Sequence, residues 1–271
     1  MVSRTKGPAP IQFGGVREPY IDGGTVAAVR AVFNRTRLAH SNWQYRRLDG
    51  RLDSRSAWRY DARNQVDIFR ERKNASPTKL NVFLLVDASG SMMGRSACNA
   101  QDVSATLVDA FKHIPTVRMH VWQHWAMGGG ATLLRRYEPG MSLEGLTKMP
   151  ETSGGNADNF ALRAIGDRAV SLQRPDTQSV IIMISDGRPS VGGRGARVSD
   201  PVIHAQKTVA DLARKRVSVL SVAIEPLGGL NVQMYGAKNV IPFTGNWSEL
   251  AQSFATTFGR FLQEAERAAR Y

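Results

Sequence analysis

Two runs of apolar residues place the strongest constraint on how this chain folds. They read "LNVFLLVD" at residues 80–87 and "QSVIIMISD" at residues 178–186. A strand that is apolar on both faces is typical of a mainly parallel sheet with helices packed on each side. Because such runs alternate with helical segments after Pro77, the pattern predicts an α/β fold.

The same patterns predict the remaining elements of one domain at residues 77–271. Further strands are expected at 118–125, 131–138, 217–224 and 239–245. Helices are expected near 95–113, 158–173, 200–215 and 247–269. Together they form a doubly wound, mainly parallel central sheet flanked by helices, of the Rossmann-like type.

Residues 1–76 have a different composition and are expected to form a basic N-terminal arm and helical extension. Residues 1–20 are rich in Pro and Gly with few periodic apolar positions, which predicts an extended arm. The helix near 24–38 follows. Residues 41–76 are dense in charge and predict short helices and a strand beside the domain rather than a core.

The net charge of +13 is unevenly distributed along the chain. Residues 1–80 hold 16 Lys and Arg against 7 Asp and Glu, whereas residues 81–271 hold 20 against 16. We expect the N-terminal region to meet an acidic protein surface or nucleic acid. The basic segments lack the interleaved aromatic residues that would make nucleic acid the first choice, so a nucleic-acid-associated or virion structural protein stays an alternative.

The sequence predicts a cytoplasmic protein without a membrane partner. No stretch reaches the roughly 18 to 20 apolar residues that a membrane helix needs, and the first residues lack the apolar centre of a signal peptide. The only cysteine, Cys98, excludes an internal disulfide and a cysteine metal cluster.

The segment that follows the first apolar run, "VDASGSMM", raises three chemical alternatives at the end of a strand. A nucleophile elbow needs Gly-x-Ser-x-Gly, which neither Ser89 nor Ser91 satisfies. A phosphate-binding loop needs Gly-x-x-x-x-Gly-Lys-Ser/Thr, which the chain lacks. His120 and His124 lie on a predicted strand and are expected to be surface or core residues rather than catalysts. The chain is therefore not expected to be an enzyme by itself.

A divalent cation site fits this segment better. Asp87 supplies negative charge, and the hydroxyls of Ser89 and Ser91 reach the same point. Two further loops at the carboxyl edge of the sheet add oxygen donors, namely Asn156 and Asp158 before one helix and Asp186 after the second apolar run. Hard oxygen donors of this kind suit Mg²⁺ or Mn²⁺.

These motifs resemble the von Willebrand factor A (VWA) domain with its metal-ion-dependent adhesion site. Asp87, Ser89 and Ser91 match the family's Asp-x-Ser-x-Ser, and Asp186 matches its Asp-Gly. The family's second loop presents a Thr, where this chain has "NAD". Position in the loop favours Asn156 as the counterpart of that Thr, whereas charge and hardness favour Asp158.

A narrower resemblance, over about residues 45 to 265, is to the C-terminal part of the CobT subunits of aerobic cobaltochelatase. It rests on "RRLDGRLDSRSAWR", "VFLLVDASGSMMGR", "GGNADNFAL" and "IIMISDGRPS". The resemblance implies a non-catalytic VWA protein that makes metal-dependent protein contacts as an adaptor of a MoxR/CobS-type AAA+ ATPase. Its alternative implication is a chelatase subunit for cobalt insertion into a corrin ring.

Overall fold

The computed structural model describes residues 16–39, 41–74, 79–127, 130–149, 151–156, 158–174, 176–189, 200–224 and 229–268. The chain divides into two compact units: a small unit of residues 33–77, and a large unit that combines the residues before it with those after it. The division falls inside helix α1 (Gly23–Ala39). Residues 16–32 thus group with the large unit, whereas the sequence analysis placed them with the N-terminal extension. Of the extended arm predicted at 1–20, residues 1–15 lie outside the described residues, and 16–20 form no helix or strand.

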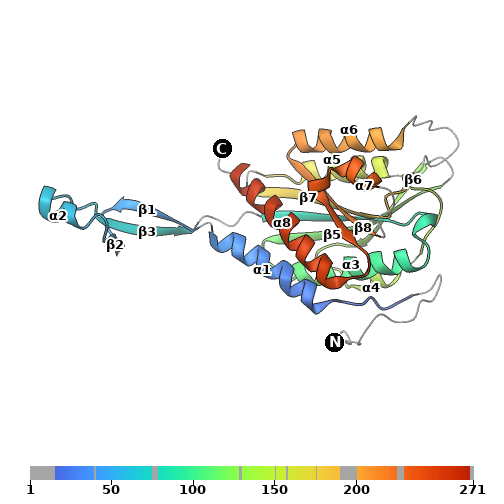
Figure 1. Ribbon diagram of the computed structural model, residues 1–271, viewed down its shortest axis with the longest axis horizontal. Coiled ribbons are helices and arrows are strands. Elements are labelled where there is room, and N and C mark those ends of the chain that lie inside the picture. The colour runs from blue at the N-terminus through green and yellow to red at the C-terminus, as the bar shows by residue number, and fades with distance from the viewer. Residues whose placement is uncertain are drawn as a thin grey trace. The chain divides into compact units, whose positions relative to one another are not determined.

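The large unit is built on a six-stranded sheet with the order β6-β5-β4-β7-β8-β9 (Figure 1). Its strands are β4 (Lys79–Asp87), β5 (Val117–Met127), β6 (Gly130–Tyr137), β7 (Thr177–Ser185), β8 (Val217–Ile224) and β9 (Val240–Phe243). Only β6 runs antiparallel to its neighbour, and the other described pairings are parallel. The predicted α/β fold with a mainly parallel sheet is confirmed.

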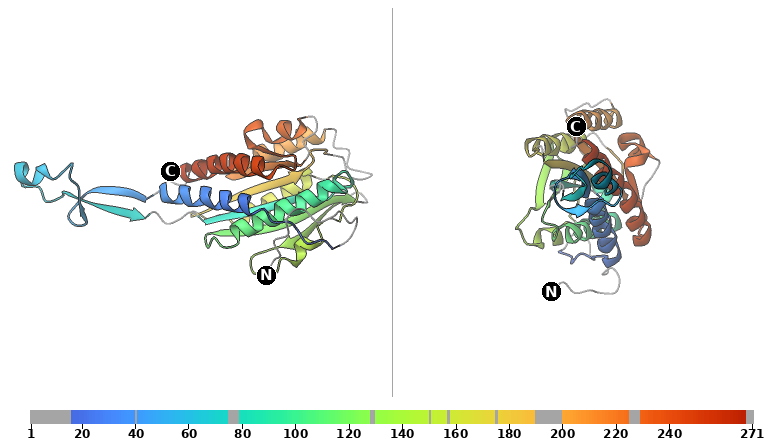
Figure 2. Two further views of the ribbon diagram at one scale, coloured as in Figure 1. Left: turned by 60° about the horizontal axis from the view of Figure 1, so that its bottom comes forward. Right: turned by 90° about the vertical axis from the view of Figure 1, so that its left-hand side faces the viewer.

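Helices cover both faces of this sheet (Figure 2). The helices of the large unit are α3 (Arg95–Phe111), α4 (Glu144–Thr147), α5 (Asp158–Ser171), α6 (Pro201–Arg214), α7 (Leu230–Tyr235) and α8 (Trp247–Ala268), with 3₁₀ turns at Gly90–Met92 and Ala237–Asn239. Side chains of α5, α6 and α7 share one core with Phe83 and Leu85 of β4. The helices α3 and α8 pack against each other through Phe111 and Phe258, on the opposite face of the sheet.

The sequence of β4 is continuously apolar because both faces of the strand are buried. Successive side chains of a strand point to opposite faces of the sheet. Phe83 and Leu85 face α5 and α6, so Val82 and Leu84 face the other helical layer, and all four are fully buried. A strand with helices on both sides has no polar face, which explains why apolar runs predicted the centre of the sheet so well.

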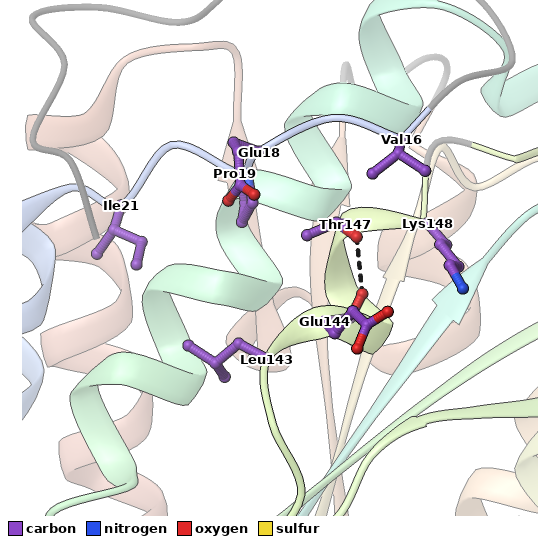
Figure 3. Close-up of a pocket in the computed structure, with 8 residues that line it drawn as sticks. All are labelled: Val16, Glu18, Pro19, Ile21, Leu143, Glu144, Thr147 and Lys148. Carbon is purple, nitrogen blue, oxygen red and sulfur yellow. Dashed lines mark hydrogen bonds between the residues drawn. The ribbon is translucent and has the colours of Figure 1, made fainter. Parts of the chain in front are cut away.

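An extended segment, Val16–Asp22, lies along α3 and α4 in the large unit. The buried guanidinium of Arg17 donates to both carboxylate oxygens of Asp102 on α3, at 2.6 and 2.9 Å, and the backbone N–H of Tyr20 donates to the same carboxylate. Between this segment and α4 lies a cavity of 330 Å³ (Figure 3). It is lined by Val16, Glu18, Pro19, Ile21, Leu143, Glu144, Thr147 and Lys148.

The small unit holds a three-stranded antiparallel sheet with the order β1-β3-β2. Its elements are β1 (Ser41–Arg47), β2 (Arg51–Leu52), α2 (Trp58–Arg63) and β3 (Phe69–Asn74). The prediction of short helices and a single strand for residues 41–76 was wrong, because the described residues 41–74 form three strands and one helix. Between residues 45 and 71 only Asp53 and Ile68 are buried, so no alternation of buried and exposed residues marks these strands in the sequence.

A candidate metal centre at the carboxyl edge of the sheet

Three segments meet where β4 and β7 end. The two strands are parallel neighbours, with Val86 opposite Ile184, so Asp87 and the residues after β7 leave the sheet at the same edge. The turn after β4 is fastened to the loop before α5, because Gly90 N–H donates to Gly154 O at 2.9 Å and Ser153 N–H donates to Ala88 O at 2.7 Å. Parallel pairing thus gathers segments that are far apart in sequence.

Asp87 lies at the centre of the hydrogen bonds between these segments. Its Oδ1 accepts from the backbone N–H of Ser89 at 2.8 Å. Its Oδ2 accepts from Nδ2 of Asn156 at 2.7 Å and from the hydroxyl of Ser185 at 3.0 Å. The hydroxyl oxygens of Ser89 and Ser91 lie 3.1 Å apart. Among the predicted donors, Asp87, Ser89, Ser91 and Asn156 are therefore brought together by hydrogen bonds.

Asp186 follows the end of β7 and is 4% exposed. Its Oδ1 accepts from the backbone N–H of Arg188 at 3.1 Å. The next residue, Gly187, has φ +74°, and a Cβ there would lie 2.4 Å from Nδ2 of Asn231. Only glycine combines this left-handed backbone with the close approach of α7, so the Asp-Gly pair fixes how the chain turns beside the site.

The side chains of Asn156 and Asp158 differ in how they are hydrogen bonded. Both ends of the Asn156 amide are engaged, since Nδ2 donates to Asp87 and Oδ1 accepts from the backbone N–H of Asp158 at 2.8 Å. The carboxylate of Asp158 is buried. Neither of its oxygens makes a hydrogen bond of good geometry within the described part of the chain, although the Tyr235 hydroxyl is close enough to interact with it. Asn156 therefore orients its neighbours, whereas Asp158 presents uncommitted oxygens.

Two buried residues outside the predicted set of site residues, His124 and Tyr235, lie beside Asp158. His124 on β5 lies opposite Asp87 in the sheet, and its Nε2 is 3.4 Å from Oδ1 of Asp158. Both ring nitrogens of His124 and the hydroxyl of Tyr235 lack hydrogen-bond partners among the described residues. Of the two positions expected for His120 and His124, surface or core, the structure shows the core, since both side chains are buried. Strand register could have indicated the proximity of His124 to Asp87, but the pairing of β4 with β5 was not known beforehand.

Burial and mutual repulsion shift the pKa values of these groups. Burial, together with the charge of Asp186, raises the pKa of Asp87 to about 7, against the opposing hydrogen bonds from Ser89 and Ser185. Burial and the charge of Asp87 raise the pKa of Asp158 well above its usual value. Burial lowers the pKa of His124 to about 3. Burial and the neighbouring negative charges thus disfavour the ionised forms of Asp87 and Asp158, and a bound cation would relieve this.

The chemistry of the donors fits a hard divalent cation that uses hydroxyls and water. Within the described ranges, no three His, Cys, Asp or Glu side chains lie close enough to hold a metal ion by themselves. An ion here would depend on the Ser89 and Ser91 hydroxyls as well as on carboxylates. Mg²⁺ is bound in this way, with few carboxylates and retained waters. The orphaned oxygens of Asp158 are the buried polar atoms that such an ion would satisfy.

Comparisons with known proteins give matches of limited extent. No family model matches the chain. It is 25% identical over 170 residues to inter-alpha-trypsin inhibitor heavy chain H2 of Mus musculus, and the match covers 56% of this chain and 16% of that relative. The chain thus spans a small part of the length of that curated relative.

Two solved structures resemble part of the chain. The pilus adhesin SpaC from Lactobacillus rhamnosus GG has a TM-score of 0.48 at 13% identity, over 71% of this chain and 31% of that one. The vWF domain of the type V pili tip protein Mfa5 from Porphyromonas gingivalis has a TM-score of 0.49 at 9% identity, over 72% of this chain and 97% of that one. The sheet order and the two helical layers described above place the large unit in the VWA/Rossmann-like class. The large unit thus has a doubly wound α/β fold with one antiparallel edge strand. None of the described helices is both long and apolar enough to cross a membrane.

Proposed function

We propose that this chain is a non-catalytic VWA-like protein that binds Mg²⁺, or Mn²⁺ in its place, and makes metal-dependent contacts with other proteins. The observation that carries the proposal is the convergence of three oxygen-bearing segments at the end of β4 and β7, with Asp87 hydrogen bonded to both of the other segments. A partner carboxylate would complete the coordination of the ion, so the contact would form only when the ion is present.

The donors proposed for the ion are Asp87, the hydroxyls of Ser89 and Ser91, and Asp158, with Asp186 adding charge beside them. Asp158 is preferred to Asn156 because, among the residues that the structure describes, its oxygens make no hydrogen bond of good geometry, whereas both ends of the Asn156 amide are occupied. In this assignment Asn156 holds Asp87 and the first turn of α5 in place.

The rim of the site supports a contact with another protein. Ser91 is exposed, although Asp87 and Ser89 beside it are buried. Met93, two residues further on, is 66% exposed. A flexible apolar side chain next to a cation with an open position gives a partner both an ionic and an apolar contact.

We propose a AAA+ ATPase of the MoxR/CobS type as the partner. This proposal rests on the resemblance of the motifs to CobT subunits. The sequence has no phosphate-binding loop, so in this proposal a separate chain supplies ATP hydrolysis. The test is co-purification of the chain with a MoxR/CobS-type ATPase in Mg²⁺ and in EDTA. Retention in both would contradict a metal-dependent contact, and no retention in either would remove this partner.

Calorimetric titration with Mg²⁺ tests the metal site separately from any partner. We expect Asp87→Asn and Asp158→Asn to weaken Mg²⁺ binding by at least about tenfold, because each removes a charged donor. The matched control is Asp167→Asn, which neutralises an exposed carboxylate on α5 and is expected to bind like the wild type. Equal binding by the wild type and Asp87→Asn would overturn the assignment, provided that circular dichroism shows both to be folded.

A further inference from the structure

The small unit exposes aromatic rings among its arginines. Tyr45 is 50% exposed, and Trp58 and Tyr60 are each 52% exposed. Tyr45 directly precedes Arg46 and Arg47, and Trp58 and Tyr60 flank Arg59. The expectation that the basic segments lack interleaved aromatic residues was therefore wrong. Half-exposed rings in a folded unit are open to a stacking partner.

The small unit has more basic than acidic side chains, so its own carboxylates cannot neutralise all of its arginines. Residues 33–77 contain 11 Lys and Arg against 5 Asp and Glu. Glu71 pairs with Arg47 at 3.2 Å, and the buried Asp53 accepts from the hydroxyl of Ser56 at 2.9 Å. Five arginines make no ion pair within the part of the chain that the structure describes, namely Arg46, Arg51, Arg55, Arg59 and Arg63. These guanidinium groups are available to an anionic partner.

Trp58 combines the two features at one place. It begins α2, and the guanidinium carbons of Arg59 and Arg63 lie 5.8 and 5.4 Å from the centroid of its ring. Both distances are within cation–π range. The result is an aromatic platform with two positive charges beside it, as required where a base stacks on the ring while the adjoining phosphates meet arginine.

We propose that residues 33–77 bind single-stranded nucleic acid, with bases stacking on Trp58 and Tyr60 and phosphates bound by Arg59 and Arg63. A single strand is favoured over a duplex because stacking on a side chain requires an unstacked base, and because α2 has only six residues, too few to cross and read a major groove. None of the proposed metal ligands takes part in this binding.

An acidic protein surface is the competing partner. It would use the same charges together with the exposed aliphatic side chains of Leu48, Leu52 and Val66. The clustering of arginine around a half-exposed tryptophan ring favours the nucleic acid, because binding through charge alone would not require an aromatic ring at this position. Binding that depends on the Trp58 ring is thus the property that separates the two partners.

The test is fluorescence anisotropy of the full chain with a labelled oligothymidine of about 20 nucleotides, in EDTA, over a series of salt concentrations. We expect binding that weakens with salt. Trp58→Ala is expected to weaken it at least about fivefold, whereas Trp58→Tyr retains most of the affinity. Arg63→Ala is expected to reduce the slope of log K against log salt by about 0.7, the value for one phosphate contact with a single strand.

Matched controls lie on α5 of the large unit, where Phe160 is 45% exposed and Arg163 is exposed. Phe160→Ala and Arg163→Ala are expected to bind the oligonucleotide like the wild type. No binding at about 50 mM salt, or equal binding by Trp58→Ala and the wild type, would overturn the proposal. Equal affinity for the matching duplex would also overturn it, and so would displacement by polyglutamate with the same dependence on Trp58, which would identify an acidic protein surface instead.

Discussion

Asp87 gives the folded protein a pH dependence whose sign follows from its surroundings. Its pKa is raised from 3.8 to about 7, so between these values the folded state keeps a proton that the unfolded chain releases. This contribution to stability is complete below the unfolded pKa and is lost as the pH rises through the folded one. His124 acts with the opposite sign, but only below its ordinary value of 6.5.

We therefore expect the metal-free protein to lose stability from about pH 6.5, above which His124 no longer offsets Asp87, to about pH 7, where Asp87 ionises in the folded state as well. The slope is expected to be no more than about 1.4 kcal/mol per pH unit for Asp87. Urea unfolding in EDTA measures this loss. Saturating Mg²⁺ is expected to remove it, because the ion binds the ionised carboxylate. Asp87→Asn should flatten the metal-free profile, whereas Asp167→Asn should leave it unchanged. A wild-type profile that rises with pH in EDTA would contradict the account.

The backbone of Gly154 leads to a second prediction at the scale of one residue. It has φ +63°, and a Cβ there would lie 2.0 Å from the carbonyl oxygen of Ala126 on β5. Gly154→Ala is expected to lower the free energy of unfolding by about 1 to 3 kcal/mol, and to weaken Mg²⁺ binding because the loop that carries Asn156 must move. Thermal unfolding and calorimetry measure the two effects.

Gly140 offers a matched control for this substitution. It also has a positive φ, of +91°, but nothing lies within 4 Å of the position of its Cβ. Gly140→Ala thus adds backbone strain without a clash and away from the proposed donors. If both variants bound Mg²⁺ as tightly as the wild type, the close approach of Gly154 to β5 would not position the loop.

The extended segment Val16–Asp22 is held to α3 by an ion pair that is almost wholly buried. The side chains of Arg17 and Asp102 are 5% and 4% exposed. Removing one partner leaves the other charge buried without compensation, so Arg17→Met is expected to cost about 3 to 5 kcal/mol in the free energy of unfolding. Denaturant unfolding of the full chain measures this cost.

The double variant Arg17→Met, Asp102→Asn is the control for this pair. It removes both charges, and we expect it to recover part of the lost stability. A cost below about 1 kcal/mol for Arg17→Met alone would indicate that water reaches the pair, and that the segment is held chiefly by its other contacts with α3 and α4.

At the scale of elements, the sequence predicted the strands that are buried on both faces, because burial requires them to be apolar throughout. Strands β4 and β7 are apolar on both faces, so their position and their central place in the sheet could be read directly. The strands of the small unit have too few buried residues to produce such a pattern. The proximity of Asp87, Asn156 and Asp186 followed from the topology of parallel sheets. The role of the Asn156 amide depended on side-chain geometry that no pattern encodes.

At the scale of the whole molecule, the two units are predicted to have separable activities. The chain leaves the large unit after Val32 and re-enters it at Thr78. Replacing residues 33–77 by a flexible Gly-Ser linker is expected to leave Mg²⁺ affinity within about twofold of the wild type and to abolish oligonucleotide binding. Calorimetry and anisotropy measure the two activities.

The converse variant completes this comparison. Asp87→Asn in the full chain should lose Mg²⁺ binding and keep the oligonucleotide. A deletion variant that loses both activities while remaining folded would mean that the small unit contributes to the metal centre.

The hydrogen bonds of Asp87 also connect distant parts of the chain, since they reach residues 69 and 98 positions away. The binding site exists only when β4 and β7 have paired. The free energy of ligand binding therefore adds to the stability of the whole large unit rather than to that of one loop. Mg²⁺ should therefore slow limited proteolysis at sites throughout that unit, far from the carboxylates themselves. Protease digestion with and without the ion would then report the assembly of the sheet's centre in a single measurement.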